Sequence, residues 1–196
     1  TAVSLHGYGE NADDILKPNV MKSKVAIDTE LKWTTLSSSK EIQPVMKILD
    51  SLECDFERVR FMKLKAGSVI GKHTDKVDKD ITDKKIVRIH IPIRTNEDVV
   101  FTTYKDVKDK TGEQLHLKTG HYYYLDVSKP HSVSNHSDID RHHLVVDCFV
   151  NDKIRSLLNW TDSSSPINHA TEKDLDKIKQ IFAPYKKDYF PHLRYD

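Results

Sequence analysis

Several features that are common in other protein classes are scarce in this chain. It has two cysteines, Cys54 and Cys148, which excludes a disulfide framework and a zinc knuckle built from CxxC pairs. No apolar run approaches the roughly 20 residues that cross a bilayer. The 31 basic and 30 acidic residues nearly cancel, so nucleic acid and anionic membranes are not expected partners. The first residues lack a signal-peptide pattern, and we therefore expect a soluble protein of the reducing cytoplasm.

Short signatures of several enzyme classes are also missing. The chain contains no GxGxxG sequence, no P-loop and no HExxH zinc-hydrolase motif. Neither cysteine has a local setting that favours a nucleophile. Histidine is present in mild excess, with 11 residues, and this excess directs attention to metal binding.

Between Phe56 and Asn151 the sequence alternates short strand-like segments with turn signals such as Ala66-Gly67 and Thr119-Gly120. The predicted strands are 56–65, 68–72, 84–93, 97–104, 113–118, 121–127, 130–135 and 140–150. Strands at this short, even spacing are typical of a β-sandwich or a jelly roll.

The flanks of this region have a different pattern. Before it we predict short strands and one helix with an apolar face, at 24–28, 31–36 and 40–52. After it we predict two helices, at 152–160 and 171–182. The length of 196 residues suits one compact domain with small additions. We therefore divide the chain into a β domain with an N-terminal helical flank, residues 1–151, and a short helical C-terminal appendage, residues 152–196.

Two of the predicted strands carry Arg and His two residues apart on one face, because side chains alternate across a strand. These faces hold Ile86, Arg88 and His90 in the first strand, and Arg141, His143, Val145, Asp147 and Phe149 in the second. The opposite faces are apolar: Val87, Ile89 and Ile91, and Leu144, Val146, Cys148 and Val150. The polar faces could point to water, as on a half-exposed sheet. Alternatively they line a barrel lumen that binds a small anion, since an arginine fork matches a carboxylate. Periodicity alone does not decide between them.

A short motif supplies candidate metal ligands. His73-Thr74-Asp75 places an imidazole and a carboxylate on one side of an extended segment. A distant histidine would complete a 2-His-1-carboxylate triad, which binds Fe(II) and leaves positions open. The motif is weak by itself, because His136-Ser137-Asp138 has the same form. Candidates for the third ligand are His131, His116, His121, His142 and His143.

Taken together, residues 58–151 resemble the aspartyl/asparaginyl β-hydroxylase family of 2-oxoglutarate-dependent oxygenases, and are most similar to its bacterial members, which include free-proline cis-hydroxylases. The segments that carry the resemblance are Arg58-Val59-Arg60-Phe61, Leu64 to Ile70, His73-Thr74-Asp75, Arg88 to Ile93, Thr95-Asn96, Gly120, Tyr123, Asp126, His131 to Asn135, and Asp140 to Asp147. Their order is the specific feature, with Arg141 ten residues after His131 and an R-x-H strand between the ligand segments.

The resemblance implies a mainly β fold, a double-stranded β-helix of the jelly-roll, cupin-like type with flanking helices. It also implies roles for six residues: His73, Asp75 and His131 as ligands of Fe(II), Arg141 as the partner of the remote carboxylate of 2-oxoglutarate, and Arg88 and His90 near the metal-bound end of that cosubstrate.

The implied activity is that of a 2-oxoglutarate- and Fe(II)-dependent dioxygenase. Such an enzyme uses O₂ to hydroxylate an unactivated C–H bond and releases succinate and CO₂. The substrate would be an amino acid, either free and proline-like or an Asp or Asn residue in a peptide. Two alternatives are a metal-dependent cupin-type enzyme that uses no 2-oxoglutarate and a noncatalytic jelly-roll binding module.

Overall fold

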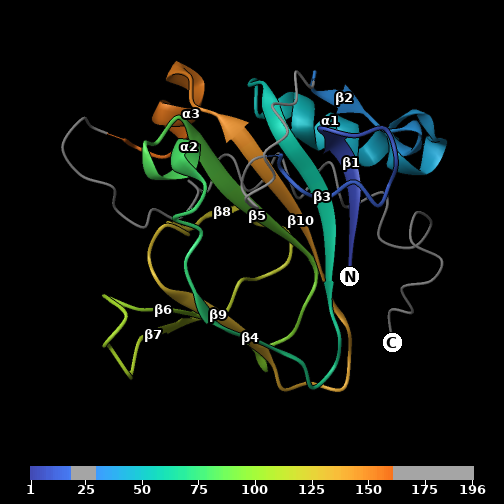
Figure 1. Cartoon of the computed structure of the whole chain (residues 1–196). Helices are drawn as coiled ribbons and strands as arrows, with labels where there is room; N and C mark the ends of the chain where they lie inside the picture. Colours follow the sequence, from blue (N-terminus) through green and yellow to red (C-terminus); the bar gives the residue numbers. More distant parts are fainter. Residues whose placement is uncertain (19–29, 161–196) are drawn as a thin grey trace.

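Two antiparallel β-sheets face each other in the computed structural model of the chain, which describes residues 1–18 and 30–160 (Figure 1). The larger sheet has the order β2-β1-β3-β10-β5-β8. Its strands are β1 (Ala2–Gly7), β2 (Lys32–Trp33), β3 (Phe56–Leu64), β5 (Ile86–Arg94), β8 (Tyr123–Tyr124) and β10 (Arg141–Phe149). The smaller sheet has the order β4-β9-β6-β7. Its strands are β4 (Val69–His73), β6 (Val99–Thr103), β7 (Glu113–Leu115) and β9 (His131–Asn135).

The chain passes repeatedly from one sheet to the other. β3, β5, β8 and β10 belong to the larger sheet, whereas β4, β6, β7 and β9, which lie between them in the sequence, belong to the smaller one. This alternation winds the chain into a double-stranded β-helix. The fold is therefore the mainly β jelly roll that the sequence predicted.

Two helices cover the outer face of the larger sheet. The short helical elements are two 3₁₀ turns (Thr35–Ser38 and Lys40–Ile42), α1 (Gln43–Ser51), α2 (Lys79–Thr82) and α3 (Asp152–Leu157). A buried cluster joins Ile48 and Leu49 of α1 and Ile154 of α3 to Ile89 and Leu144 of the sheet. Each such side chain stabilises the fold by about 1.5–3 kcal/mol relative to an exposed one. α3 thus packs into the same core as the strands. Every helix of residues 1–18 and 30–160 is too short to span a bilayer.

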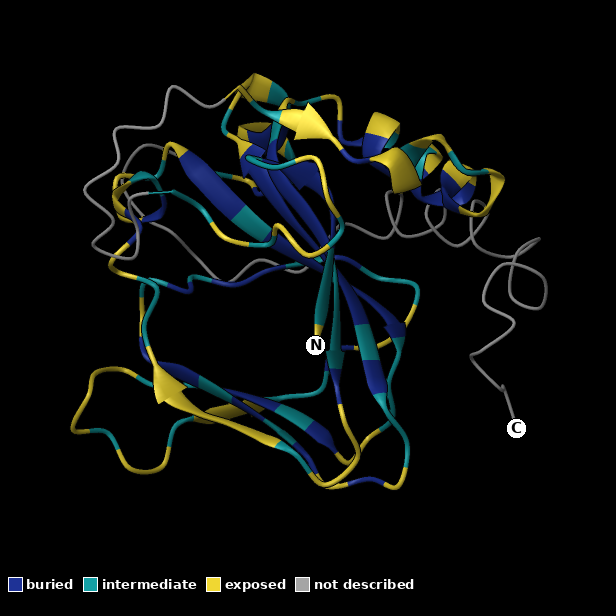
Figure 2. Ribbon diagram, turned by 45° about the vertical axis from the view of Figure 1, so that its right-hand side comes forward, coloured by how far each residue is buried: buried dark blue, intermediate teal, exposed yellow. Residues whose placement is uncertain are grey.

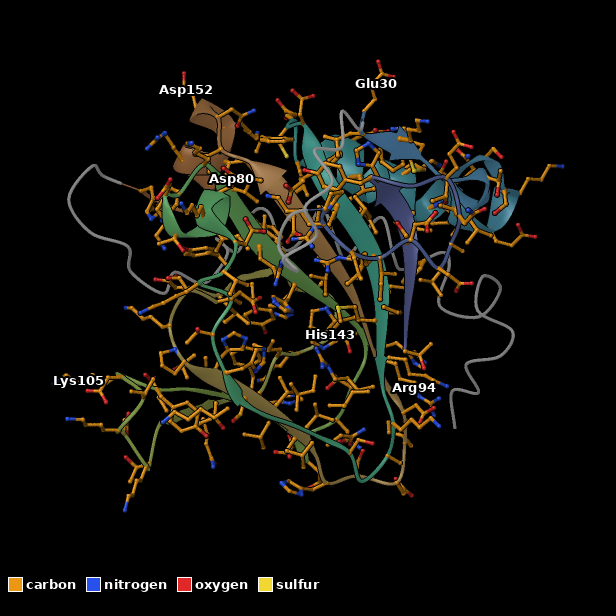
Figure 3. All side chains as sticks on the ribbon, viewed as in Figure 1. Glu30, Asp80, Arg94, Lys105, His143 and Asp152 are labelled. Carbon is orange, nitrogen blue, oxygen red and sulfur yellow. The ribbon has the colours of Figure 1, made fainter. Side chains whose placement is uncertain are left out.

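The polar faces of β5 and β10 point inward, to the lumen between the sheets. Asp147 is fully buried, His143 is 1% exposed and Arg141 is 5% exposed. Figure 2 shows the burial along these long strands, and Figure 3 shows His143 between the two sheets. The interpretation that these faces contact water is wrong, because the helices already occupy the apolar side of the same sheet and leave the polar side to face the smaller one.

The predicted strands from 56 to 150 are confirmed, with differences at their ends. The predicted strands 113–118 and 121–127 are shorter in the structure, as β7 and β8. Gly67 and Gly120 of the predicted turns have positive φ angles, 68° and 82°. The sequence patterns missed β1 and α2, and the predicted strand 31–36 is β2 followed by a 3₁₀ turn. The predicted strand 24–28 and helix 171–182 lie outside the described residues, so the division at residue 152 stays a prediction.

Candidate metal centre

Strand pairing brings the two predicted histidine ligands together. His73 at the end of β4 is the register partner of His131 at the start of β9, and their ring centroids are 4.2 Å apart. In each ring Nδ1 lies close to a backbone carbonyl oxygen, 2.8 Å from Gly71 O and 2.9 Å from Lys129 O. A carbonyl only accepts, so both Nδ1 atoms carry the proton. Each Nε2 therefore keeps the lone pair that a metal ligand needs.

Asp75 completes the predicted triad. Its Oδ1 lies 3.8 Å from His73 Nε2, and one donor atom from each of the three residues lies within 4.8 Å of the others. The backbone N–H of Asp75 donates to Val127 O at 2.9 Å, which ties this loop beside β9. Two imidazoles and one carboxylate are a donor set suited to a divalent transition metal such as Fe(II). The competing candidates His116 and His121 instead place Nδ1 at 3.2 Å from backbone oxygens, outside this cluster.

The surroundings of His131 favour its neutral form. His131 is 6% exposed, and its ring stacks on Phe101, with ring centroids 5.5 Å apart and ring planes 7° from parallel. Burial lowers the pKa of His131, and this effect exceeds the opposing one of the hydrogen bond to Lys129. A neutral imidazole is the form that binds a metal. His131 therefore does not need to lose a proton before it can act as a ligand.

Arg88 lies beside the triad. Its Nη1 donates to Asp75 Oδ2, while Nε and Nη2 donate to Asp147 at 2.6 and 3.1 Å. Asp147 also accepts a hydrogen bond from Arg60 at 2.8 Å and forms an ion pair with Arg58 at 2.9 Å. Asp75 Oδ1 is thereby left as the oxygen that faces the histidines.

Arg141 lies deeper in the lumen and has a different environment. Its Nη2 is 2.6 Å from His143 Nδ1, and it makes no ion pair within the described residues. Burial lowers the pKa of Arg141 to about 10, which reflects the cost of a buried cation. A small cavity beside it is lined by Thr95, Val99, Phe101, Leu117, Val133, Arg141 and His143. The chemistry of this position matches a ligand carboxylate.

His90 adds two polar atoms to the same space. Both of its ring nitrogens, and Nε2 of His143, are buried without a hydrogen-bond partner in the described part of the chain. The two rings have centroids 6.1 Å apart. Burial and then the charge of Arg141 lower the pKa of both rings well below the ordinary value. The two rings are therefore neutral, and each can offer one N–H to an anion.

A buried asparagine fixes the turn that leads from β9, which begins at His131, to β10, which begins at Arg141. Nδ2 of Asn135 donates to the carbonyl oxygens of Leu64, Lys65 and Ile139 at 3.2, 3.1 and 2.8 Å. Its Oδ1 accepts from the backbone N–H and the hydroxyl of Ser137 at 3.1 and 2.6 Å. The start of β10 is thus held against the end of β3.

Six residues of the inner network were not predicted as site residues: Lys17, Glu57, Arg58, Arg60, Asp78 and Asp147. They form ion pairs that continue from Arg88 away from the triad. The alternation in β10 had placed Asp147 on the same face as Arg141. The presence of Asp147 on the same face as Arg141 could therefore have indicated a buried ion pair. Its actual partners, however, come from strands that are far away in the sequence.

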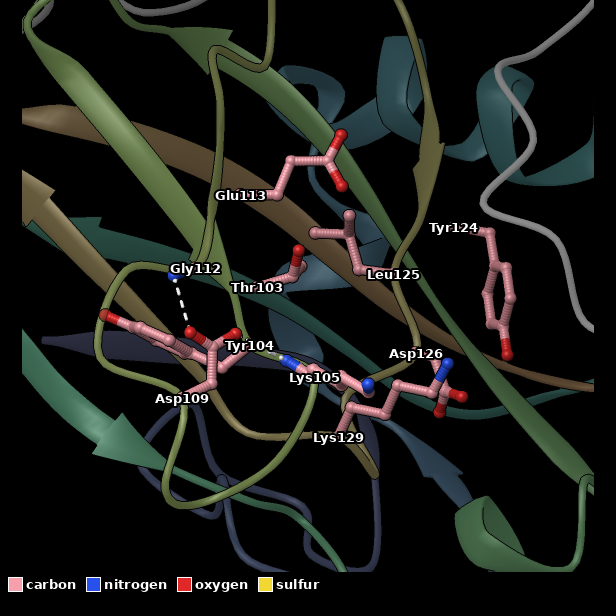
Figure 4. A pocket seen from close by; sticks show the side chains of 10 residues that line it. All are labelled: Thr103, Tyr104, Lys105, Asp109, Gly112, Glu113, Tyr124, Leu125, Asp126 and Lys129. Carbon is pink, nitrogen blue, oxygen red and sulfur yellow. Dashed lines mark hydrogen bonds between the residues drawn. The ribbon is translucent and has the colours of Figure 1, made fainter.

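A separate cavity of about 310 Å³ lies between the β6–β7 hairpin and the residues after β8 (Figure 4). Asp109 on its rim accepts hydrogen bonds from Lys105, Thr111 and Gly112 within its own loop, at 3.0 to 3.1 Å. Asp126 is paired with Lys84 at 2.9 Å. None of the six predicted site residues lines this cavity.

Comparison with known proteins gives one family match. A family model described as aspartyl/asparaginyl beta-hydroxylase matches residues 29–150. A search of curated proteins found no match.

Several solved structures are similar to this chain. A predicted oxalate decarboxylase from Thermotoga maritima has a TM-score of 0.35 and 20% identity, covering 52% of this chain and 73% of its own. A cupin domain from Bordetella pertussis has a TM-score of 0.35 and 17% identity, covering 47% and 81%. A non-heme monooxygenase, the ThoJ–Ni complex, has a TM-score of 0.39 and 13% identity, covering 65% and 60%.

Proposed function

Because the chain belongs to the aspartyl/asparaginyl β-hydroxylase family, we propose that it is a 2-oxoglutarate- and Fe(II)-dependent dioxygenase that hydroxylates an amino acid. The observation that carries the proposal is the convergence of His73, Asp75 and His131, with donor atoms within 4.8 Å of one another. These three residues would hold Fe(II). The bound iron would supply the activation of O₂ and the oxidation of the C–H bond.

The arginine and histidines of the lumen support the cosubstrate part of the proposal. Arg141 would pair with the remote carboxylate of 2-oxoglutarate, where low solvent access strengthens a charge-assisted hydrogen bond. Neutral His90 would donate to the keto-acid end, and Arg88 lies on the same face of β5, nearer to Asp75. The buried cation and the unpartnered ring nitrogens are groups that a dicarboxylate would satisfy.

The protein part of the mechanism is orientation and exclusion of water. Phe101 stacks on His131 and closes one side of the lumen, while His73, whose side chain is 42% exposed, leaves the cluster accessible from outside. An open side is where the substrate would approach. We propose a substrate that is an amino acid, free and proline-like or an Asp or Asn residue of a peptide, and a reaction in the cytoplasm, where Cys54 and Cys148 stay free thiols.

The test is turnover by purified protein. Incubation with Fe(II), 2-oxoglutarate and a panel of free amino acids and Asp- or Asn-containing peptides should yield succinate, and mass spectrometry should find a product heavier by one oxygen atom. Absence of succinate with every substrate would overturn the proposal. In that case, metal binding without 2-oxoglutarate binding would indicate a cupin-type enzyme of another class, and no metal binding would indicate a binding module.

A further inference from the structure

The three residues of the triad are held in place in different ways. His73 and His131 sit on paired strands, and each ring is anchored through Nδ1 to a carbonyl two residues away. Asp75 lies beyond the end of β4, in no strand. Within residues 1–18 and 30–160, its backbone makes two hydrogen bonds, from its N–H to Val127 O and from Asp78 N–H to its own carbonyl. Its side chain therefore needs a tether of its own, since a mobile carboxylate loses rotamer freedom when it binds a cation.

Arg88 supplies that tether and connects it to the centre of the larger sheet. One end of its guanidinium donates to Asp75 Oδ2, and the other end makes a two-point contact with Asp147 at 2.6 and 3.1 Å. Arg88 and Asp147 are register partners on the adjacent strands β5 and β10. A planar fork with two fixed contacts has few alternative orientations, so the Nη1 atom that faces Asp75 is fixed by Asp147.

Asp147 is itself immobile. It is fully buried in β10, and Arg58 and Arg60 of β3 hold it from the side opposite to Arg88. Burial alone would raise the pKa of Asp147, but the charges of Arg88, Arg60 and Arg58 outweigh it and keep the pKa below the ordinary range. The carboxylate stays ionised, and its geometry is set by three strands of the sheet.

We propose that Asp147 and Arg88 are positioning residues for a divalent cation, which aim Oδ1 of Asp75 at the two histidines. This inference rests on the proposed function, because it assumes that the triad binds a metal. Outer hydrogen-bond partners of metal ligands typically change metal affinity by about 10–100-fold when they are removed.

The experiment measures the affinity for Mn(II) directly, from the spectrum of free Mn(II) during titration of the full chain. Asp147→Asn removes the charge that fixes Arg88 while keeping the shape of the side chain. Arg88→Lys keeps the positive charge but cannot bridge two carboxylates. We expect both variants to weaken Mn(II) binding by about 10–100-fold.

Glu57→Gln is the matched control. Glu57 is 1% exposed and belongs to the same buried network through Tyr8, Lys17 and Arg58, but it makes no contact with Arg88. Its loss should lower stability and leave Mn(II) affinity within about twofold of the wild type, because the tether is intact.

The outcomes separate the two proposals. Wild-type affinity in folded Asp147→Asn and Arg88→Lys proteins, or equal weakening in the Glu57→Gln control, would overturn the positioning role alone. Failure of the wild-type chain to bind Mn(II) at all would overturn the proposed function and this inference with it. If Asp147→Asn does not fold, the Arg88→Lys titration decides whether the tether positions Asp75.

Discussion

The two ends of the inner face of β10 differ in how their buried charges are paired. Asp147, near the end of β10, accepts three hydrogen bonds from Arg88 and Arg60 and forms an ion pair with Arg58. Arg141, at the start of the same strand and on the same face, has a neutral histidine as its hydrogen-bond partner and no described carboxylate. A buried charge that is fully paired belongs to the fold, whereas a buried cation without an anion costs stability. The Arg141 end therefore has an unmet need for an anion, which the proposed carboxylate ligand would satisfy.

The strongest effect is expected from removing His131, the proposed metal ligand at the start of β9. His131→Ala should abolish Mn(II) binding and succinate formation, because only one imidazole and one carboxylate remain. Metal titration and a succinate assay measure this. His116→Ala is the control, since His116 lies outside the cluster, and both readouts should be unchanged. Retained iron-dependent turnover in His131→Ala would show that His131 is not a metal ligand.

Asp147→Ala tests the paired end of the strand. The substitution leaves three buried guanidiniums without their shared carboxylate, and we expect the free energy of unfolding to fall by about 3–5 kcal/mol. Urea denaturation followed by circular dichroism measures the change. Lys63→Met removes a more exposed ion pair, with Asp140 at 3.1 Å, and leaves the hydrogen bond from Ala66 N–H to Asp140 in place, so it should cost less than about 1 kcal/mol. Equal losses in the two variants would show that burial of the pair has no special role.

Arg141→Met tests the other end. Replacing an unpaired buried cation by an apolar side chain should leave the free energy of unfolding unchanged or raise it. The affinity for 2-oxoglutarate should fall on the order of 100-fold, the effect of removing one partner of a buried charge pair. Calorimetry on the metal-loaded protein gives both values. Arg155→Met, on the exposed side of α3, should change neither, and a large stability loss in Arg141→Met would contradict the assignment.

The smallest effect concerns pH. His90 is neutral in the folded protein because burial, and then the charge of Arg141, lowers its pKa, while an unfolded histidine protonates near pH 6.5. The unfolded state thus binds more protons below about pH 6.5, so acid destabilises the fold by up to about 1.4 kcal/mol per pH unit for this residue. His90→Gln should reduce the slope of unfolding free energy against pH between about 6.5 and 5. An unchanged slope would show that His90 does not contribute.

Much of this arrangement could be predicted from alternation along single strands. It placed Arg88 and His90, and Arg141 and His143, on common faces, and the structure puts those faces in the lumen. The direction of the faces was undecided because it depends on α1 and α3, which cover the opposite side.

Other features depend on partners that a local pattern does not contain. β1 carries buried polar residues, Ser4 and His6, so its sequence does not look like a strand, and it forms because β3 pairs with it. The contact of Asp147 with Arg88 likewise requires β10 and β5, 59 residues apart at that point, to be neighbours. The family resemblance supplied the third ligand, which spacing alone left open among five histidines.

Asn135 helps to fix the distance in space between His131 and Arg141. Its side-chain amide donates hydrogen bonds to three carbonyl groups, which fixes the turn before β10. The position of Arg141, at the start of β10, is therefore fixed relative to His131. If Arg141 binds the remote carboxylate of 2-oxoglutarate, as we propose, this fixed distance would favour a diacid of one length. On that proposal, selection for a keto acid one methylene longer or shorter would act on this turn, whereas selection for a different substrate would act on the exposed side of His73.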